Sequence, residues 1–124
     1  RREYLTVERR AREALSGAPS VEAEVTGIDA FWEPPNGEGP VVYLAVTSPG
    51  LHDLHARLVK LFGAIDELEG DAYVPHVTLG RGASRRAVER LQRRPFDPIR
   101  FSIDTLEFYD GTYGERIDTI SLPA

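Results

Sequence analysis

The chain has 124 residues, a size that fits one domain able to bury a core without metals or disulfides. Its formal net charge of −5 argues against broad attraction to nucleic acid or to an anionic membrane, and allows only a local basic patch. The lack of cysteine excludes thiol redox chemistry, and no apolar run approaches the roughly 20 residues that span a bilayer. We therefore expect one cytoplasmic domain over residues 1–124 that has no membrane partner.

The first part of the chain predicts a helix and two strands. The helix runs from Thr6, a candidate N-cap, to Leu15, and "SGAPS" ends it. Residues 21–32, "VEAEVTGIDAFW", alternate apolar and polar side chains and change phase at Gly27, which predicts a β-bulge. After the loop "EPPNGEGP", the nearly unbroken apolar run "VVYLAVT" is typical of a central buried strand. We expect these two strands to pair antiparallel.

The second part begins with the clearest helix pattern in the chain. Ser48, Pro49 and Gly50 precede an apolar stripe made of Leu51, Leu54, Leu58, Leu61, Phe62 and Ile65. A strand containing "YVPHVTLGRG" follows, and Ser84 is a candidate N-cap for a short helix, "RRAVERLQRR". The segments "PIRFSIDTLEFYD" and "RIDTISLPA" read as two final strands joined around "GTYGE". Because helices and strands mix without regular βαβ alternation, we predict an α+β fold with mostly antiparallel sheets and packed helices.

The strand "YVPHVTLGRG" holds the residues best suited to chemistry. Side chains two apart on a strand share a face, so His76 and Thr78 should project side by side. An isolated triplet of this kind is more often a half-buried histidine bonded to a carbonyl, next to a threonine chosen for strand propensity. The surrounding residues decide between the two readings.

The pattern "PHVTLGR" resembles one of the two H-x-[TS] signature motifs of the 2H phosphoesterase superfamily, which includes 2′-5′ RNA ligase-like proteins and RNA 2′,3′-cyclic phosphodiesterases. The order "VVYLAV", "LHDLHARL", "YVPHVTL" and the ending "SLPA" are similar to the second lobe of such proteins, over residues 20–124. The resemblance implies a two-lobed fold and a site that uses neither metal nor cofactor. It also implies that His76 transfers a proton, that Thr78 binds phosphate, and that Arg81 binds the anionic substrate. We expect Tyr73 to contact the substrate as well, as an aromatic ring able to stack on a base.

A second H-x-[TS] motif is missing from this sequence. The nearest relic is "YLTV" at residues 4–7, where Tyr4 takes the histidine position, and tyrosine, with a reference pKa of about 10, is a poor general base. We prefer the interpretation that the motif lies upstream of Arg1, so that the fold is N-terminally truncated and residues 1–19 are a remnant of the first lobe. A third interpretation is that a second copy of the chain supplies it, although we favour a monomer.

Three other groups of residues are weaker candidates for a functional site. His52 and His55, three apart on a helix, could bind a metal with Asp53, but the sequence offers no convincing third ligand, so we predict no metal site. The arginines of "RRAVERLQRR" could guide an RNA backbone, although a solvated helix face is the more common explanation. Tyr73, Tyr109 and Tyr113 are candidates for stacking on a base.

The resemblance thus implies an RNA-end-processing phosphoesterase. It would hydrolyse 2′,3′-cyclic phosphate termini or act on 2′-5′ phosphodiester bonds, and its partner would be an RNA terminus or a small cyclic nucleotide. The alternative is a non-catalytic RNA- or nucleotide-binding module with a degenerate first motif.

Overall fold

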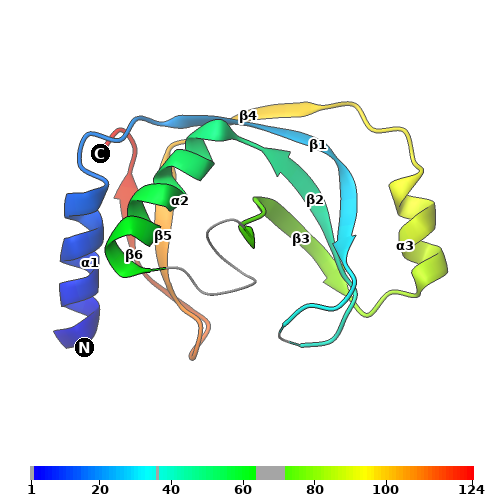
Figure 1. Cartoon of the computed structure of the whole chain (residues 1–124), viewed down its shortest axis with the longest axis horizontal. Helices are drawn as coiled ribbons and strands as arrows, with labels where there is room; N and C mark the ends of the chain where they lie inside the picture. Colours follow the sequence, from blue (N-terminus) through cyan, green and yellow to red (C-terminus); the bar gives the residue numbers. More distant parts are fainter. Residues whose placement is uncertain (1, 36, 64–71) are drawn as a thin grey trace.

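The computed structural model describes residues 2–35, 37–63 and 72–124, and Figure 1 shows their arrangement. In chain order the elements are α1 (Arg2–Ala14), β1 (Val21–Phe31), β2 (Val41–Thr47), α2 (Pro49–Phe62), β3 (His76–Arg81), α3 (Arg85–Gln92), β4 (Ile99–Ile103), β5 (Thr105–Asp110) and β6 (Glu115–Ser121). Helices packed on antiparallel sheets confirm the predicted α+β class. Within the described ranges, no helix is long and apolar enough to cross a membrane.

The strands form two antiparallel sheets. The larger sheet has the order β3-β2-β1-β4 and curls into a half-barrel, and the smaller sheet is the hairpin β5-β6 (Figure 1). Strand β2 lies between β1 and β3, which confirms that "VVYLAVT" is a central strand. The register of β1 against β2 shifts between Val25 and Gly27, which confirms the predicted bulge.

The helix starts follow local capping chemistry, with one exception. Ser48 caps α2 by accepting a hydrogen bond from the backbone N–H of Leu51 at 3.2 Å, and Ser84 caps α3 in the same way through Ala87 at 3.1 Å. The predicted start of the first helix at Thr6 is wrong, because α1 begins four residues earlier and Thr6 lies within it. Ile65, the last member of the predicted apolar stripe, lies outside the described residues.

The C-terminal strands differ from the sequence prediction. The segment "PIRFSIDTLEFYD" is two strands in two sheets, since β4 pairs with β1 whereas β5 pairs with β6. The chain changes sheet at Asp104, whose backbone carbonyl accepts a hydrogen bond from the N–H of Leu122 at 2.7 Å. The sequence indicates this break. Phe101 and Ile103 are two residues apart, as on one face of a strand, but the next apolar residue of the pattern, Leu106, follows after three.

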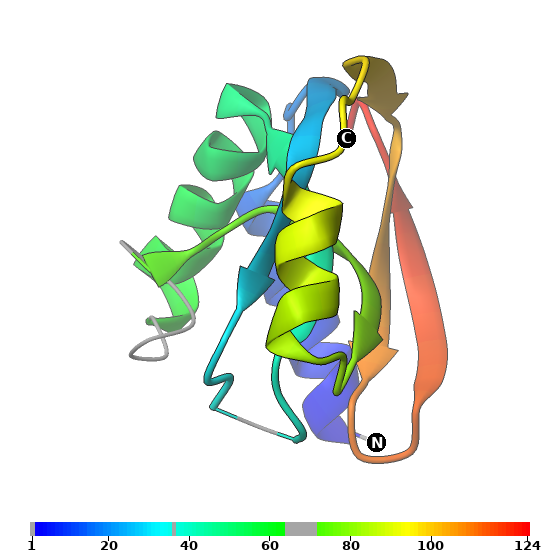
Figure 2. The same ribbon diagram turned by 90° about the vertical axis from the view of Figure 1, so that its right-hand side faces the viewer.

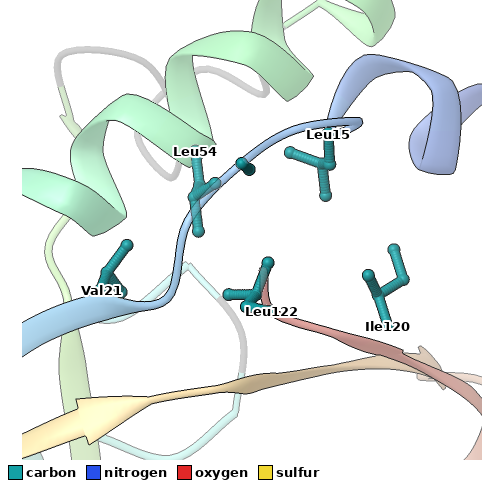
Figure 3. Close-up of a cluster of buried hydrophobic side chains, with 6 residues drawn as sticks. Leu15, Val21, Leu54, Ile120 and Leu122 are labelled. Carbon is teal, nitrogen blue, oxygen red and sulfur yellow. The ribbon is translucent and has the colours of Figure 1, made fainter. Parts of the chain in front are cut away.

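The main core joins segments from both ends of the chain. Figure 3 shows its side chains converging from the segment after α1, from β1 and α2, and from the C-terminal end of the chain. The cluster consists of Leu15, Ala18, Val21, Leu54, Ile120 and Leu122. Each is at most 5% exposed, and full burial of a leucine side chain stabilises a fold by about 1.5–3 kcal/mol. This core holds the hairpin and both long helices against the curled sheet.

Candidate functional site

Strand β3 presents His76 and Thr78 on one face of the larger sheet. In the register of β3 with β2, His76 lies opposite Ala45 and Thr78 lies opposite Tyr43. Residues opposite each other in an antiparallel pair share a face, so both polar side chains lie on the face that carries Tyr43. We call this surface the site face. Every residue of β3 is exposed, so a ligand can reach both groups.

Pro75 explains how β3 begins. A proline has no N–H to donate, which suits the position just before a strand, and it favours an extended conformation at Val74. The Pro75 carbonyl accepts a hydrogen bond from the backbone N–H of Val46 at 3.2 Å, which fastens this segment to β2. His76 therefore follows a backbone that is anchored immediately before it.

The His76 ring is held by one hydrogen bond and two aromatic neighbours. Its Nδ1 lies 2.6 Å from the carbonyl oxygen of Val74. A carbonyl oxygen only accepts, so Nδ1 carries the proton, and in the neutral ring Nε2 carries the lone pair. The ring also meets Phe31 edge to face at a centroid distance of 5.1 Å, and Tyr43 at 5.4 Å. The imidazole thus has a defined tautomer and orientation.

The rows across the sheet give His76 and Thr78 different surroundings. Beside His76 the row continues through Ala45 to Gly27, where a methyl group would meet no neighbouring atom within 4 Å. Beside Thr78 the row continues through Tyr43 to Asp29. Burial, followed by the nearby negative charge of Asp29, raises the pKa of Tyr43, so this phenol stays protonated at neutral pH.

Phe31 and Tyr43 were not predicted as site residues. Their rings stack at 4.3 Å with an interplanar angle of 26°, and together they form the aromatic floor beneath His76. The sequence contained one signal, a hydroxyl-bearing tyrosine in the middle of the otherwise apolar run "VVYLAVT". Assigning Tyr43 to the site also required the register with β3, which the sequence did not provide.

Arg81 lies on the site face beyond Thr78, whereas Tyr73 packs on α2. Arg81 lies opposite Val41 of β2, so it shares the face of Tyr43 and Thr78, and it is three residues, about 10 Å, beyond Thr78. Its Nη1 donates to the Glu38 carbonyl at 3.3 Å in the loop before β2. Tyr73 stacks on His55 at 3.8 Å and meets His52 edge to face at 5.4 Å, so its ring packs on α2. Burial raises the pKa of Tyr73. Their predicted contacts with substrate remain predictions.

Three other sets of residues that the sequence analysis considered are Tyr4 with Thr6, the possible metal ligands, and Tyr109 with Tyr113. Tyr4 lies in α1, where residues two apart do not share a face, so Tyr4 and Thr6 do not form a strand motif like that of His76 and Thr78. The Tyr4 hydroxyl instead donates to Asp110 Oδ2 at 2.6 Å. Across the part of the chain that the structure describes, no group of three or more histidine and carboxylate side chains is placed to hold a metal ion. Tyr109 and Tyr113 are exposed on the β5-β6 hairpin.

The geometry supports proton transfer next to an anion. Nε2 of His76 can take a proton from a nucleophile or, once protonated, deliver one to a leaving oxygen. The hydroxyl of Thr78 and its neighbouring backbone can donate hydrogen bonds to an oxyanion beside that ring. An imidazole and a hydroxyl on one exposed face therefore suit acid–base chemistry at a phosphate.

Comparison with known proteins agrees with this chemistry. The family model described as "2′-5′ RNA ligase superfamily" matches residues 2–114, which is most of the chain. The match includes the whole of β3 and the strands and helices that position it. A search of curated proteins found no significant match.

Proposed function

Because the chain belongs to the 2′-5′ RNA ligase superfamily, the group of 2H phosphoesterases, we propose that it acts on RNA ends and hydrolyses terminal 2′,3′-cyclic phosphates. The observation that carries this proposal is the exposed pair of His76 and Thr78 on one face of β3, with the His76 tautomer set by Val74. A 2′-5′ phosphodiester is the other substrate of the same chemical kind.

The reaction needs two proton transfers. Water attacks phosphorus and gives up a proton to a base, while the P–O bond to one ribose oxygen breaks and that oxygen receives a proton from an acid. His76 performs one of these transfers through Nε2. Thr78 donates a hydrogen bond to a non-bridging oxygen, on which negative charge accumulates as water adds.

The second proton-transfer group is expected from outside the described residues. His52 and His55 pack around Tyr73 on α2, and neither belongs to an H-x-[TS] motif. The second group would come from a further segment of the natural protein. The alternative source is His76 of a second copy that approaches the edge of β3 opposite to β2. If activity requires a second copy, the specific rate will rise with protein concentration.

The single H-x-[TS] motif also favours a second candidate function. With one imidazole the site face can bind a terminal phosphate without turning it over, as a non-catalytic RNA- or nucleotide-binding module would. Binding of a phosphorylated RNA end without hydrolysis in any form of the protein would establish this alternative.

The test is hydrolysis of an oligoribonucleotide that ends in a 2′,3′-cyclic phosphate, assayed in EDTA. It should be run on residues 1–124 and on the protein expressed from its natural start codon. In whichever form is active, His76→Ala should lower the rate by at least the roughly 10²-fold typical of a lost general acid or base.

His52→Ala is the matched control, because it removes an exposed imidazole from α2. Equal activity of His76→Ala and the unsubstituted protein would overturn the proposal. Loss of activity in EDTA that added metal restores would overturn its metal-independent form.

A further inference from the structure

The charge of the molecule is distributed unevenly, and α3 is its basic extreme. Six arginines and one glutamate fall within residues 81–94, a local charge of +5 in a chain whose net charge is −5. All six are exposed, and four of them lie on and just after α3 beyond its first residue. We call these four the basic face: Arg86, Arg90, Arg93 and Arg94.

The structure separates this face from the part of α3 that packs. Val88 is fully buried, and α3 lies beside β1 on its outer side, in the foreground of Figure 2. Residues two before and two after a helical position point away from it, so Arg86 and Arg90 lie opposite Val88. Arg85 and Gln92 face the strand instead, with Arg85 4.5 Å from the Trp32 ring centroid and Gln92 donating to Asp29 at 3.0 Å.

In the ion pairs that the structure describes, the acidic residues near α3 do not neutralise the positive charges of the basic face. Glu89 pairs with Arg85 at 3.8 Å, and the Glu38 carboxylate lies beside Gly82. Among the ion pairs that the structure describes, none involves Arg86, Arg90, Arg93 or Arg94. A solvated helix face ordinarily mixes both signs of charge, as α1 does.

The placement of the arginines destabilises α3 when no anion is bound to it. Arg86 and Arg90 stand four residues apart within α3, a spacing at which like charges repel. Arg85 and Arg86 also occupy the first turn, where the helix dipole favours negative charge, and that turn contains no acidic residue. A bound polyanion would reverse both effects.

The spacing fits a chain of phosphates. Arg86, Arg90 and Arg93 advance along one side of α3 by about 6 Å and then about 4.5 Å, so a continuous backbone can contact all three. Strand β3 leads directly from the site face to this helix, because only residues 82–84 separate Arg81 from α3 (Figure 1).

We infer that the basic face binds the phosphate backbone of single-stranded RNA, and so holds the body of the molecule whose end the site face receives. This inference rests on the proposed function for its choice of RNA as the polyanion. Binding is independent of sequence because every contact is to phosphate.

The experiment measures binding separately from catalysis. A fluorescent oligoribonucleotide with an ordinary 3′-hydroxyl, which has no reacting group, is titrated with protein at several salt concentrations. The variant Arg86→Gln/Arg90→Gln/Arg93→Gln removes three charges and keeps good helix formers. The control, Arg9→Gln/Arg57→Gln/Lys60→Gln, removes three exposed charges on α1 and α2.

The α3 variant should bind at least roughly tenfold more weakly at physiological salt, and the slope of log K against log salt should fall by about 2. The control should bind as the unsubstituted protein does. Equal weakening in both variants, or an unchanged slope in the α3 variant, would overturn the inference. Binding that depends on α3 in a protein that never hydrolyses a cyclic phosphate would support the basic face and refute the catalytic proposal.

Discussion

His76 depends on its neighbours for the chemistry proposed. The Val74 carbonyl sets the tautomer, and Phe31 and Tyr43 hold the ring plane, while Thr78 lies next to it on the same face. The two polar groups were predictable from the sequence because the period of a strand places residues two apart on one side. The aromatic floor was not predictable, since it depends on the pairing of three strands.

Thr78 offers a test of the phosphate contact that leaves the strand intact. Thr78→Val keeps a β-branched side chain, which suits the strand, but removes the hydroxyl. Loss of one hydrogen bond to a charged group should weaken binding of a 3′-phosphorylated nucleotide by roughly 10- to 100-fold, as measured by calorimetry. Thr78→Ser should restore most of the affinity. If Thr78→Val binds as tightly as the unsubstituted protein, the hydroxyl does not contact phosphate.

The Tyr4–Asp110 hydrogen bond links α1 to the C-terminal hairpin and predicts a pH dependence of stability. The bond from Tyr4 is the main reason that the pKa of Asp110 is lowered, with smaller contributions from the backbone N–H groups of Thr112 and Tyr113. A carboxyl whose pKa is lower in the folded state stabilises the fold above its unfolded pKa of about 3.9. That contribution is lost as pH falls through the folded value.

Tyr4→Phe should therefore lower the free energy of unfolding at pH 7, and the difference from the unsubstituted protein should shrink below about pH 4. Urea denaturation of Tyr4→Phe and of the unsubstituted protein, at pH 7 and below about pH 4, measures this difference in the free energy of unfolding. The exposed Tyr113→Phe substitution is the control for loss of a phenolic hydroxyl. A destabilisation of the same size at both pH values would show that the charge of Asp110 is not involved.

At the scale of elements, the helix caps, the bulge at Gly27 and the central position of β2 followed from local patterns. These features depend on residues close in sequence, which is why they were predictable. The split between β4 and β5 was missed because both halves have strand-forming residues, and only tertiary contacts decide which sheet each joins. Which sheet a strand joins depends on the strands that it pairs with in the folded protein.

The crossing of α2 over β1 depends on Gly50. A methyl group at this position would lie 2.6 Å from Val21 Cβ and Cγ1, closer than packed carbons allow. Gly50→Ala should destabilise the protein by about 1–3 kcal/mol through overpacking, measured by chemical denaturation. Gly111→Ala is the matched control, because a methyl group there meets no neighbouring atom within 4 Å. Stabilities that are equal in the two variants would mean that α2 can shift away from β1 at little cost.

Over the whole molecule, the first helix and the last strands belong together. Arg12 of α1 donates to the Thr119 carbonyl at 2.9 Å and pairs with Asp118 at 3.3 Å, and Leu15 shares the core with Ile120 and Leu122. The sequence could not predict these contacts between residues more than 100 positions apart. A division of the chain at residue 19 remains a prediction, and in this structure such a boundary would separate α1 from the hairpin on which it packs.

The most direct test of the central claim is to locate a bound phosphate by NMR. The imidazole signals of His52, His55 and His76 and the amide signal of Thr78 are followed during titration with a 3′-phosphorylated nucleotide, the type of product expected from cyclic-phosphate hydrolysis. We predict saturable shifts at His76 and Thr78, which Thr78→Val weakens, and no comparable change at His52 or His55. Shifts confined to the histidines of α2, or no saturable shift at His76, would contradict the assignment of β3 as the phosphate site.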